Sequence, residues 1–258
     1  MYRRLWRYRS LLLTMVKRQY QLRYRQSLVG FAWAIFPPIA SLLVATLVFH
    51  TVIGVETGSD VSYPLFTLAG LAPWTFFTSA VSSGVPSVVG SIQLVTRFSF
   101  PRAVLPISFL GTALIDLALT AGIFIAYVLV TGEGIKLTAL LFPILLAVEI
   151  VLATGIILLG SALNTFARDI RLAVPMVMQL WLFLTPVMYP LTTVPDSLRA
   201  FYLANPMTGV IENFRLILVF GKPLDWSLLM PSVIAAVGLL LIGSWYFSSV
   251  EDRFADVI

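Results

Sequence analysis

Two carboxylates are the residues best able to do chemistry within the apolar part of this chain. Asp116 and Glu149 each lie in an apolar stretch as long as a membrane-spanning helix. A charged side chain at the centre of a bilayer costs ~2.5–3.5 kcal/mol on insertion scales, so such groups face protein or water. The pair indicates either a proton relay in a secondary transporter or two carboxyl groups that are protonated or hydrogen-bonded for structural reasons.

Other reactive side chains are scarce. The chain has no cysteine and a single histidine, His50, so we expect no disulfide, no thiolate site and no metal centre. Its only Gly-Lys pair, Gly221-Lys222, precedes Pro223 and lacks the upstream glycine of a phosphate-binding P-loop. These features predict a non-enzymatic subunit without a cofactor of its own.

The composition indicates an all-α membrane protein. Hydrophobic residues make up 59% of the 258 residues and charged residues only 11%, whereas soluble domains carry roughly 25% charged residues. The net charge of +5 does not indicate nucleic acid as a partner, because the basic residues lie at the N-terminus and between apolar runs.

Uncharged stretches of ~20 residues, the length needed to cross the hydrocarbon core, predict six transmembrane helices in one domain. The predicted spans are 29–53, 63–88, 104–130, 138–164, 172–190 and 227–249. Residues 1–25 precede the bundle of 26–250, and residues 251–258 form a tail. The segment 192–225 is too polar and proline-rich to span, which leaves two short helices dipping into the outer leaflet or an ordinary external loop.

The basic residues predict the orientation. Residues 1–25 hold eight of them and no acid, and five more fall on the same side if six spans alternate, so that side holds 13 of the 17. The five are Arg97, Arg102, Arg168, Arg171 and Arg253. Since short cytoplasmic loops are enriched in Lys and Arg, we expect both termini in the cytoplasm.

The N-terminal segment has a helical period of its own. Leu5, Tyr8, Leu12, Val16 and Tyr20 recur at spacings of three and four, and polar residues follow the same spacing on another face. This pattern favours a basic amphipathic helix in the cytoplasmic headgroup layer. The alternative is a flexible arm whose arginines only set the topology.

Several motifs, in order along nearly the whole chain, resemble one family. They are Arg23–Trp33 followed by Pro37, Leu94–Pro106, Asn164–Ile170, Gln179 with Pro186-Val187 and Tyr189-Pro190, and Asn205-Pro206 through Arg215. The set resembles the permeases of polysaccharide ABC exporters, which export O-antigen, teichoic acid and related glycans. One departure is Val29, where the family has leucine before Gly30.

The resemblance implies a division of labour. Two permease copies form a channel for a lipid-linked polysaccharide of the O-antigen type in the bacterial inner membrane. Two separate ATPase subunits, which bind ATP and magnesium, dock on the cytoplasmic face. It also implies short re-entrant periplasmic helices before the last span.

Two cytoplasmic segments are candidates for contact with that ATPase. The first holds Thr96, Arg97, Phe98, Phe100 and Arg102, where aromatics would fill a groove of the partner and arginines would meet its acids. The alternative is a tight turn whose arginines reach lipid phosphates. In the second, Arg168 and Asp169 either cap helix ends or make a smaller ATPase contact.

Aromatic residues of the first and fifth spans are candidates for the channel wall, because flat rings suit the C–H faces of sugars. They are Trp33, Phe36, Trp181, Phe183 and Tyr189. The alternative for each is an anchor at the membrane interface or a lipid-facing side chain.

Three other functions fit parts of the sequence. The same architecture could export a drug or small lipid, Asp116 and Glu149 could drive a proton-coupled transporter, or the chain could be a structural assembly subunit.

Overall fold

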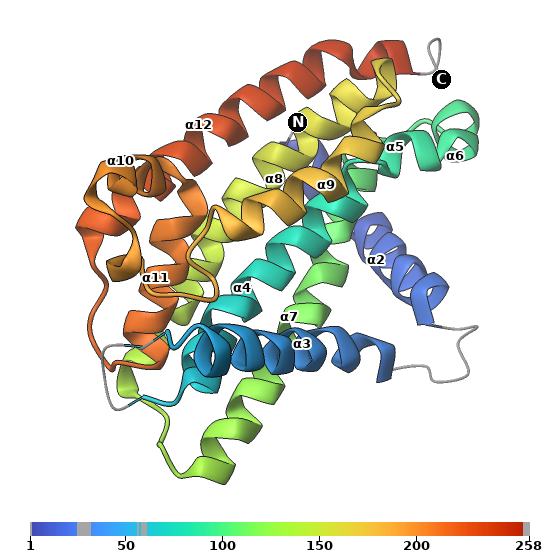
Figure 1. The fold of residues 1–258 in the computed structure, drawn as a ribbon. Helices are drawn as coiled ribbons and strands as arrows, with labels where there is room; N and C mark the ends of the chain where they lie inside the picture. Colours follow the sequence, from blue (N-terminus) through green and yellow to red (C-terminus); the bar gives the residue numbers. More distant parts are fainter. Residues whose placement is uncertain (1, 25–31, 56, 58–60, 255–258) are drawn as a thin grey trace.

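The computed structural model describes residues 2–24, 32–55, 57 and 61–254, and within them the regular structure is entirely helical (Figure 1). The helices are α1 (Tyr2–Arg7), α2 (Arg9–Tyr24), α3 (Ala32–Ala45), η1 (Thr46–Val52), α4 (Tyr63–Gly84), α5 (Ser87–Gly90), α6 (Ile92–Arg97), α7 (Val104–Thr131), η2 (Leu137–Leu141), α8 (Phe142–Phe166), α9 (Ile170–Phe183), η3 (Leu191–Thr193), α10 (Asp196–Ala204), α11 (Pro206–Leu218), α12 (Trp226–Val250) and η4 (Glu251–Arg253). The predicted all-α fold is thereby confirmed for the described residues.

Five stretches of the described chain are long and apolar enough to cross a membrane. They are Ile35–Val52, Tyr63–Gly84, Val104–Thr131, Leu137–Phe166 and Trp226–Arg253. The predicted fifth span, 172–190, is wrong in its length, because α9 has only 14 residues and ends at Phe183. At 1.5 Å per residue α9 is ~21 Å long, shorter than the ~30 Å hydrocarbon core. Pro186 explains the early end, since its ring clashes with a helical carbonyl four residues before it.

The other predicted boundaries differ by a few residues. The helix predicted over 63–88 ends at Gly84, and α5 begins after Pro86. Residues 29–31 of the first predicted span lie outside the described residues, and seven residues near its end, Thr46–Val52 (η1), form a π-helix. Gly132, with φ +74°, ends α7 in the left-handed conformation that glycine tolerates.

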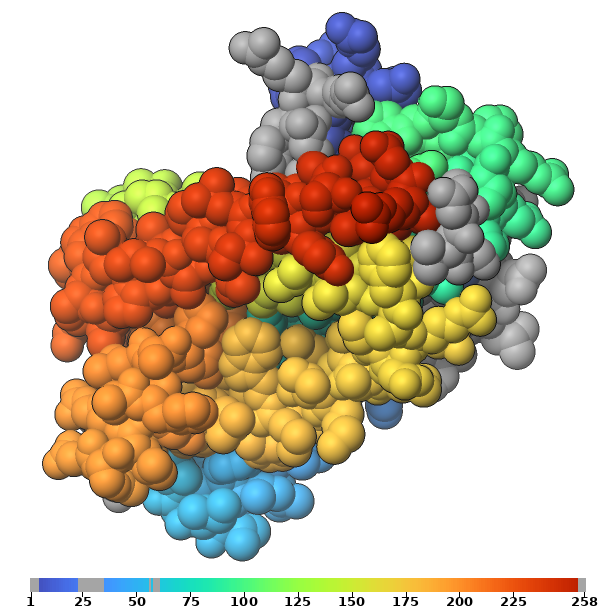
Figure 2. Space-filling model, turned by 90° about the horizontal axis from the view of Figure 1, so that it is seen from above, coloured from blue at the N-terminus to red at the C-terminus, as the bar shows by residue number. Residues whose placement is uncertain are grey.

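The bundle is built around α4, of whose apolar stretch 78% is buried. Around it lie α3, α7, α8, α9 and α11 (Figure 1). The most extensive helix contact joins α8 and α12, where Gly243 meets the carbonyl oxygen of Gly155. Figure 2 shows the opposite face of α12 running along the surface of the molecule.

The bundle has two ends, which we call the terminal end and the loop end. The terminal end carries α1, α5, α6, the 166–169 turn and η4, and the loop end carries η2, α10 and α11 (Figure 1). At the loop end α11 is packed inside the protein, with Gly209 against the backbone of Leu228 on α12. The predicted pair of short helices is therefore present, while its depth in a membrane stays a prediction.

The predicted N-terminal helix is present as α1 and α2, which separate at Tyr8. Its apolar stripe faces the protein, because Leu5 is buried, Tyr8 and Leu12 pack against buried residues, and Val16 contacts Gly111 of α7. The flexible-arm alternative is thus wrong for residues 2–24. Trp6 stays 72% exposed, and a location in the headgroup layer remains a prediction.

Candidate functional site

The segment from Ser91 to Ala103 is held by its apolar side and presents its polar side outwards. The side chain of Val95 is buried, whereas Thr96, Arg97 and Phe98 are exposed. The helix α6 ends at Arg97, because Phe98 adopts an extended backbone, with φ −126° and ψ 137°. The Thr96 hydroxyl donates to the carbonyl of Ile92, 2.9 Å away within its own helix. Phe98, 63% exposed, is the most prominent apolar group of the segment.

The other two candidates of this segment have a different environment. Phe100 is half-buried and packs against the terminal cluster, a set of buried residues at the terminal end. The members of the terminal cluster are Leu5, Met15, Val88, Val95, Ala103, Val104, Leu105, Leu158, Ala162, Phe247 and Phe254. The Arg102 guanidinium donates to the carbonyl oxygen of Glu251. Phe100 and Arg102 therefore hold the segment against the bundle, while Phe98 remains accessible.

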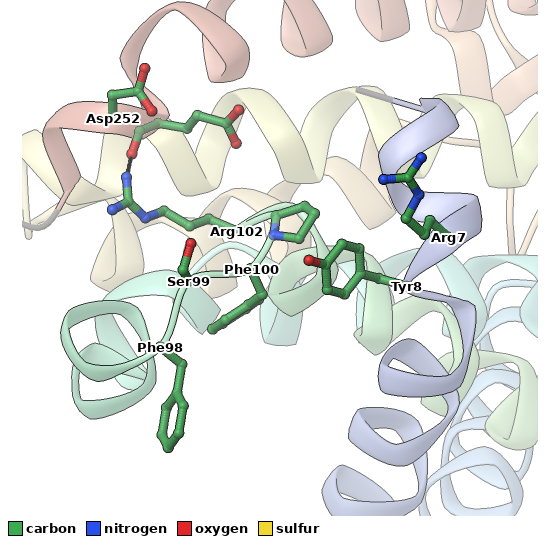
Figure 3. Close-up of a pocket in the computed structure, with 9 residues that line it drawn as sticks. Arg7, Tyr8, Phe98, Ser99, Phe100, Arg102 and Asp252 are labelled. Atoms are coloured by element: carbon green, nitrogen blue, oxygen red, sulfur yellow. Dashed lines mark hydrogen bonds between the residues drawn. The ribbon is translucent and has the colours of Figure 1, made fainter.

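A polar pocket of about 330 Å³ lies beside this segment (Figure 3). Its walls come from three separate parts of the chain: Arg7 and Tyr8 of the N-terminal helices, residues 98–102, and Glu251 with Asp252. In Figure 3 the ring of Phe98 points away from Arg102 and Asp252. The pocket thus carries both charge signs at the terminal end, and Phe98, which also lines it, turns its ring away from Arg102.

The second candidate segment, 166–169, lies close by. Arg168 and Asp169 are both exposed, and Asp169 occupies the N-cap position of α9 without a capping bond from its side chain. Asn164 takes that role instead, since its Oδ1 accepts the backbone N–H of Arg171 at 3.0 Å. Helix capping therefore does not account for the Asp169 side chain, which stays available to a partner.

The terminal cluster connects the two candidate segments. The ring of Phe254, which is fully buried, lies 6.4 Å from the ring of Phe166 and 5.3 Å from that of Phe247. Val95 and Ala103 of the first segment belong to the same cluster. Residues 91–103 and the 166–169 turn are therefore parts of one packed face.

The channel candidates fall into different environments. Trp33 belongs to α3, but its side chain lies outside the described residues. Phe36 and Phe183 are 61% and 55% exposed. Trp181 is half-buried; its indole N–H donates to Asn205 Oδ1 at 3.0 Å and its ring meets that of Phe77 edge-on at 5.3 Å.

Tyr189 belongs to a row of aromatic rings at the loop end. Its hydroxyl donates to the carbonyl of Phe183 at 2.6 Å and lies 2.8 Å from the hydroxyl of Tyr202. Its ring is stacked at 6.5 Å with Phe49, and Tyr202 in turn meets Phe201 at 6.3 Å. The row joins three elements: η1, the turn that follows α9, and α10. Its first and last members, Phe49 and Tyr202, are about 150 residues apart in the sequence.

One polar group at the loop end was not singled out from the sequence: Arg215, in the segment 192–225. Its side chain is fully buried, 3.7 Å above the ring of Phe66, and donates to the carbonyl of Val187 at 2.6 Å and to Glu212 Oε1 at 2.7 Å. Arg215 thus fastens α11 to α4 and to the turn after α9. The signal was the acid three residues earlier, followed by an apolar run from Leu216 to Phe220.

The two carboxylates of the spans are not joined. Asp116 Oδ2 accepts the hydroxyl of Ser79 at 2.7 Å. Glu149 is fully buried, and neither of its oxygens has a hydrogen-bond partner among the described residues. A proton relay from one acid to the other would therefore need a path that these hydrogen bonds do not supply.

Comparison with known proteins places this arrangement in a family. The chain is 31% identical over 258 residues to the O-antigen export system permease protein RfbA of Myxococcus xanthus, covering 99% of this chain and 98% of that protein. A protein of the same name from Klebsiella pneumoniae is 26% identical over 250 residues, covering 96% and 95%. The polysialic acid transport protein KpsM of Escherichia coli is 27% identical over 203 residues, 77% of either chain.

The family assignment rests on a match that covers most of the fold. Residues 10–219, from α2 to the end of α11, match the family described as ABC-2 type transporter. The five apolar stretches agree with a multi-pass membrane protein. The chain belongs to the ABC-2 type transporter family.

Proposed function

We propose that this chain is the channel-forming subunit of an ATP-binding-cassette exporter that moves lipid-linked polysaccharide, of the O-antigen type, across the bacterial inner membrane. It would act as a homodimer, with both termini cytoplasmic and with ATP and magnesium bound by two separate ATPase subunits. The relatives named as O-antigen permeases, which align over almost the whole chain, support this assignment. The main structural support for this assignment is the packed face at the terminal end.

The terminal end offers what force transmission requires. Phe98 is exposed on a short segment whose apolar side, through Val95, is fixed in the terminal cluster. An aromatic anchor of this kind, next to Arg97, suits a partner groove with an acidic rim. Because Arg168 and Asp169 lie on the same packed face, a displacement of the partner would reach α7, α8 and α12 together.

A pull-down of the tagged permease tests this coupling role. Phe98→Ala, alone and with Arg97→Ala, is expected to reduce the co-purifying ATPase activity by about tenfold or more. A tenfold change corresponds to ~1.4 kcal/mol of binding free energy, and an aromatic anchor buried in a partner contributes at least this much. Ile135→Ala is the matched control, because Ile135 is 65% exposed at the opposite end. An ATPase that still co-purifies with the Phe98 variant would remove the coupling role from this segment.

For the glycan path we propose the aromatic residues of the loop end. The row of Phe49, Tyr189, Tyr202 and Phe201 offers successive flat faces without a deep pocket, which suits a polymer that must slide. Phe36 and Phe183 are exposed enough to extend it. Phe183→Ala with Phe201→Ala should lower surface glycan while the ATPase still co-purifies, and unchanged surface glycan would contradict this path.

Rival functions give different outcomes in the same experiments. A permease for a drug or small lipid would keep the ATPase but leave surface glycan unchanged when the gene is deleted. A proton-coupled transporter would purify without an ATPase, and its transport would collapse with the proton gradient and depend on Asp116 and Glu149.

A further inference from the structure

A second cavity, of about 410 Å³, lies between α3, α4 and α7, away from the pocket at the terminal end. The wall that α4 contributes is a row of hydroxyl side chains. They are Thr75, Thr78, Ser79, Ser82 and Ser83. Spacings of three, four, seven and eight put all five on one face of a helix. This spacing of serine and threonine residues is visible in the sequence, but no prediction was made from it.

The facing helices add further polar groups to a lining that is otherwise apolar, with Pro37, Pro38, Leu71, Trp74, Leu182 and Met188. Asp116 and Thr120 come from α7 and Ser41 from α3. The Ser79 hydroxyl donates to Asp116 Oδ2 at 2.7 Å, and the Thr78 hydroxyl is buried without a hydrogen-bond partner. The lining thus holds seven hydroxyl groups and one carboxylate, in a protein of which 59% is hydrophobic.

This lining restricts what the cavity can hold. The Thr75 and Thr120 hydroxyls donate to backbone carbonyls of their own helices, whereas the Thr78 hydroxyl has no partner. A buried hydroxyl without a partner costs about 1–3 kcal/mol, and an alkyl chain would leave that of Thr78 unpaired. Within the described residues no group of three metal-ligating side chains exists, which disfavours a divalent cation. Serine and threonine hydroxyls both donate and accept, and a ligand that matches them must do the same.

A sugar ring has these properties. Its hydroxyl groups would donate to Asp116 and exchange hydrogen bonds with the serine and threonine row. Trp74, which also lines the cavity and packs edge-on against Trp181 at 6.5 Å, supplies an aromatic surface for C–H groups. The volume of about 410 Å³ falls within the ~300–1,000 Å³ of ligand pockets.

We propose that this hydroxyl-lined cavity binds a sugar residue of the transported glycan inside a single protomer, behind α3. The identity of the glycan rests on the proposed function, whereas the class of ligand, a polyol, rests on the lining. The wall formed by α3 is lightly attached, since only 11% of the apolar stretch of α3 and η1 is buried. A ligand therefore enters by displacing α3 from α4 and α7.

The absence of cysteine from the natural sequence makes the cavity directly testable. Ser82→Cys and Ser41→Cys, on opposite walls, would be labelled in nanodiscs with a small water-soluble thiol reagent. The probe is the mixture of sugars and oligosaccharides that mild acid releases from the surface glycan of the source bacterium. We expect it to slow labelling of both variants by about tenfold, or ~1.4 kcal/mol.

Matched variants separate binding from unspecific effects. Ser99→Cys is the control, because Ser99 is exposed in the loop between α6 and α7, away from the cavity, and sugar should leave its labelling unchanged. Asp116→Asn and the shape-conserving Thr78→Val should each weaken the protection of Ser82→Cys. Both are compared by size-exclusion profile, so that a misfolded variant is recognised.

Four results would overturn the proposal. They are no labelling at either wall, labelling that sugar does not slow, equal slowing at Ser99→Cys, and slowing by sodium in place of sugar. Surface glycan and ATPase co-purification are measured in the same variants. Glycan export without protection removes the sugar site and leaves the exporter, whereas protection without an ATPase removes the exporter and leaves the site.

Discussion

The helices α3 and α4 are in contact, yet they are buried to very different extents. The stretch of α3 and η1 is 11% buried, and α4 is 78% buried, although α4 is the least apolar of the five spanning candidates. In water the more apolar helix would be the interior one. In a bilayer the lipid solvates apolar side chains, so association depends on small residues and polar contacts. Low hydropathy within a span therefore marks the centre of the protein.

The largest test of this contrast compares two glycines of one helix, α12. A Cβ at Gly243 would collide with the carbonyl oxygen of Gly155, whereas a Cβ at Gly238 meets nothing within 4 Å. Gly243→Leu should cost more than ~3 kcal/mol, the upper part of the range for overpacking, because backbone cannot move aside as a side chain can.

Fluorescence-detected size exclusion of tagged protein measures the difference. Gly243→Leu is expected to yield little monodisperse protein, and Gly238→Leu a peak like that of the parent. Equal yields would mean that the contact between α8 and α12 does not hold the bundle together.

The next test concerns the polar fastening of α4 at the loop end. Arg215→Met leaves Glu212 and the carbonyl of Val187 without their buried partner, and breaking such a pair costs ~3–5 kcal/mol. Arg215→Lys should recover little, because an ammonium cannot reproduce the planar guanidinium fork. The thermal unfolding temperature of the purified protein reports the loss.

Two variants control for the Arg215 result. Arg199→Met removes an arginine whose side chain is 55% exposed and should change stability by less than ~0.5 kcal/mol. Adding Glu212→Leu to Arg215→Met removes the orphaned carboxylate and should restore part of the loss. If Arg215→Met behaved like Arg199→Met, the buried arginine would not fasten the two helices.

A third test compares α3 and α4 directly by deleting one large side chain from each. Phe76→Ala on α4 empties a fully buried site and should cost ~3 kcal/mol, at the low end for such deletions. Leu47→Ala on η1 trims a side chain that is 61% exposed and should cost less than ~0.5 kcal/mol. A large loss for Leu47→Ala, seen only in a dimeric preparation, would instead place a second copy of the chain on this face.

The helix boundaries that could be predicted from the sequence are those that hydropathy and charge determine. Hydropathy and charge placed α7 and α12 to within one or two residues, because an uncharged run of this length has few alternatives to a spanning helix. It overestimated α9, where Pro186 ends the helix in spite of continuing apolar residues. Proline geometry, a local effect, there outweighed a composition averaged over 19 residues.

The candidate site was predictable in its residue types and not in its contacts. The sequence pointed to Phe98 beside Arg97, but the bond from Arg102 to Glu251 joins positions 149 residues apart. Trp181 was a channel candidate because of its place in the fifth span, and its hydrogen bond to Asn205 joins it to a residue 24 positions later. Such pairings depend on tertiary packing, which a single sequence does not display.

The smallest test asks how an exposed helix keeps its end in place, and it uses Asp225 at the start of α12. The carboxylate accepts the Ser227 hydroxyl at 2.5 Å and the backbone N–H groups of Ser227 and Leu228, and these bonds hold the pKa of Asp225 below its ordinary value. Asp225→Ala should cost ~1 kcal/mol, as for other lost N-caps.

Because the folded-state pKa of Asp225 is lowered, this stabilisation is present above the unfolded pKa of ~3.9 and is lost as the pH falls through the folded-state pKa. The difference in unfolding temperature between the parent and Asp225→Ala should therefore shrink below about pH 4, whereas Asp225→Asn, which also caps but does not titrate, should keep its advantage over alanine. A gap between parent and Asp225→Ala that stayed constant with pH would assign the cap to the backbone contacts of Asn213, and the carboxylate would then have no part in anchoring α12.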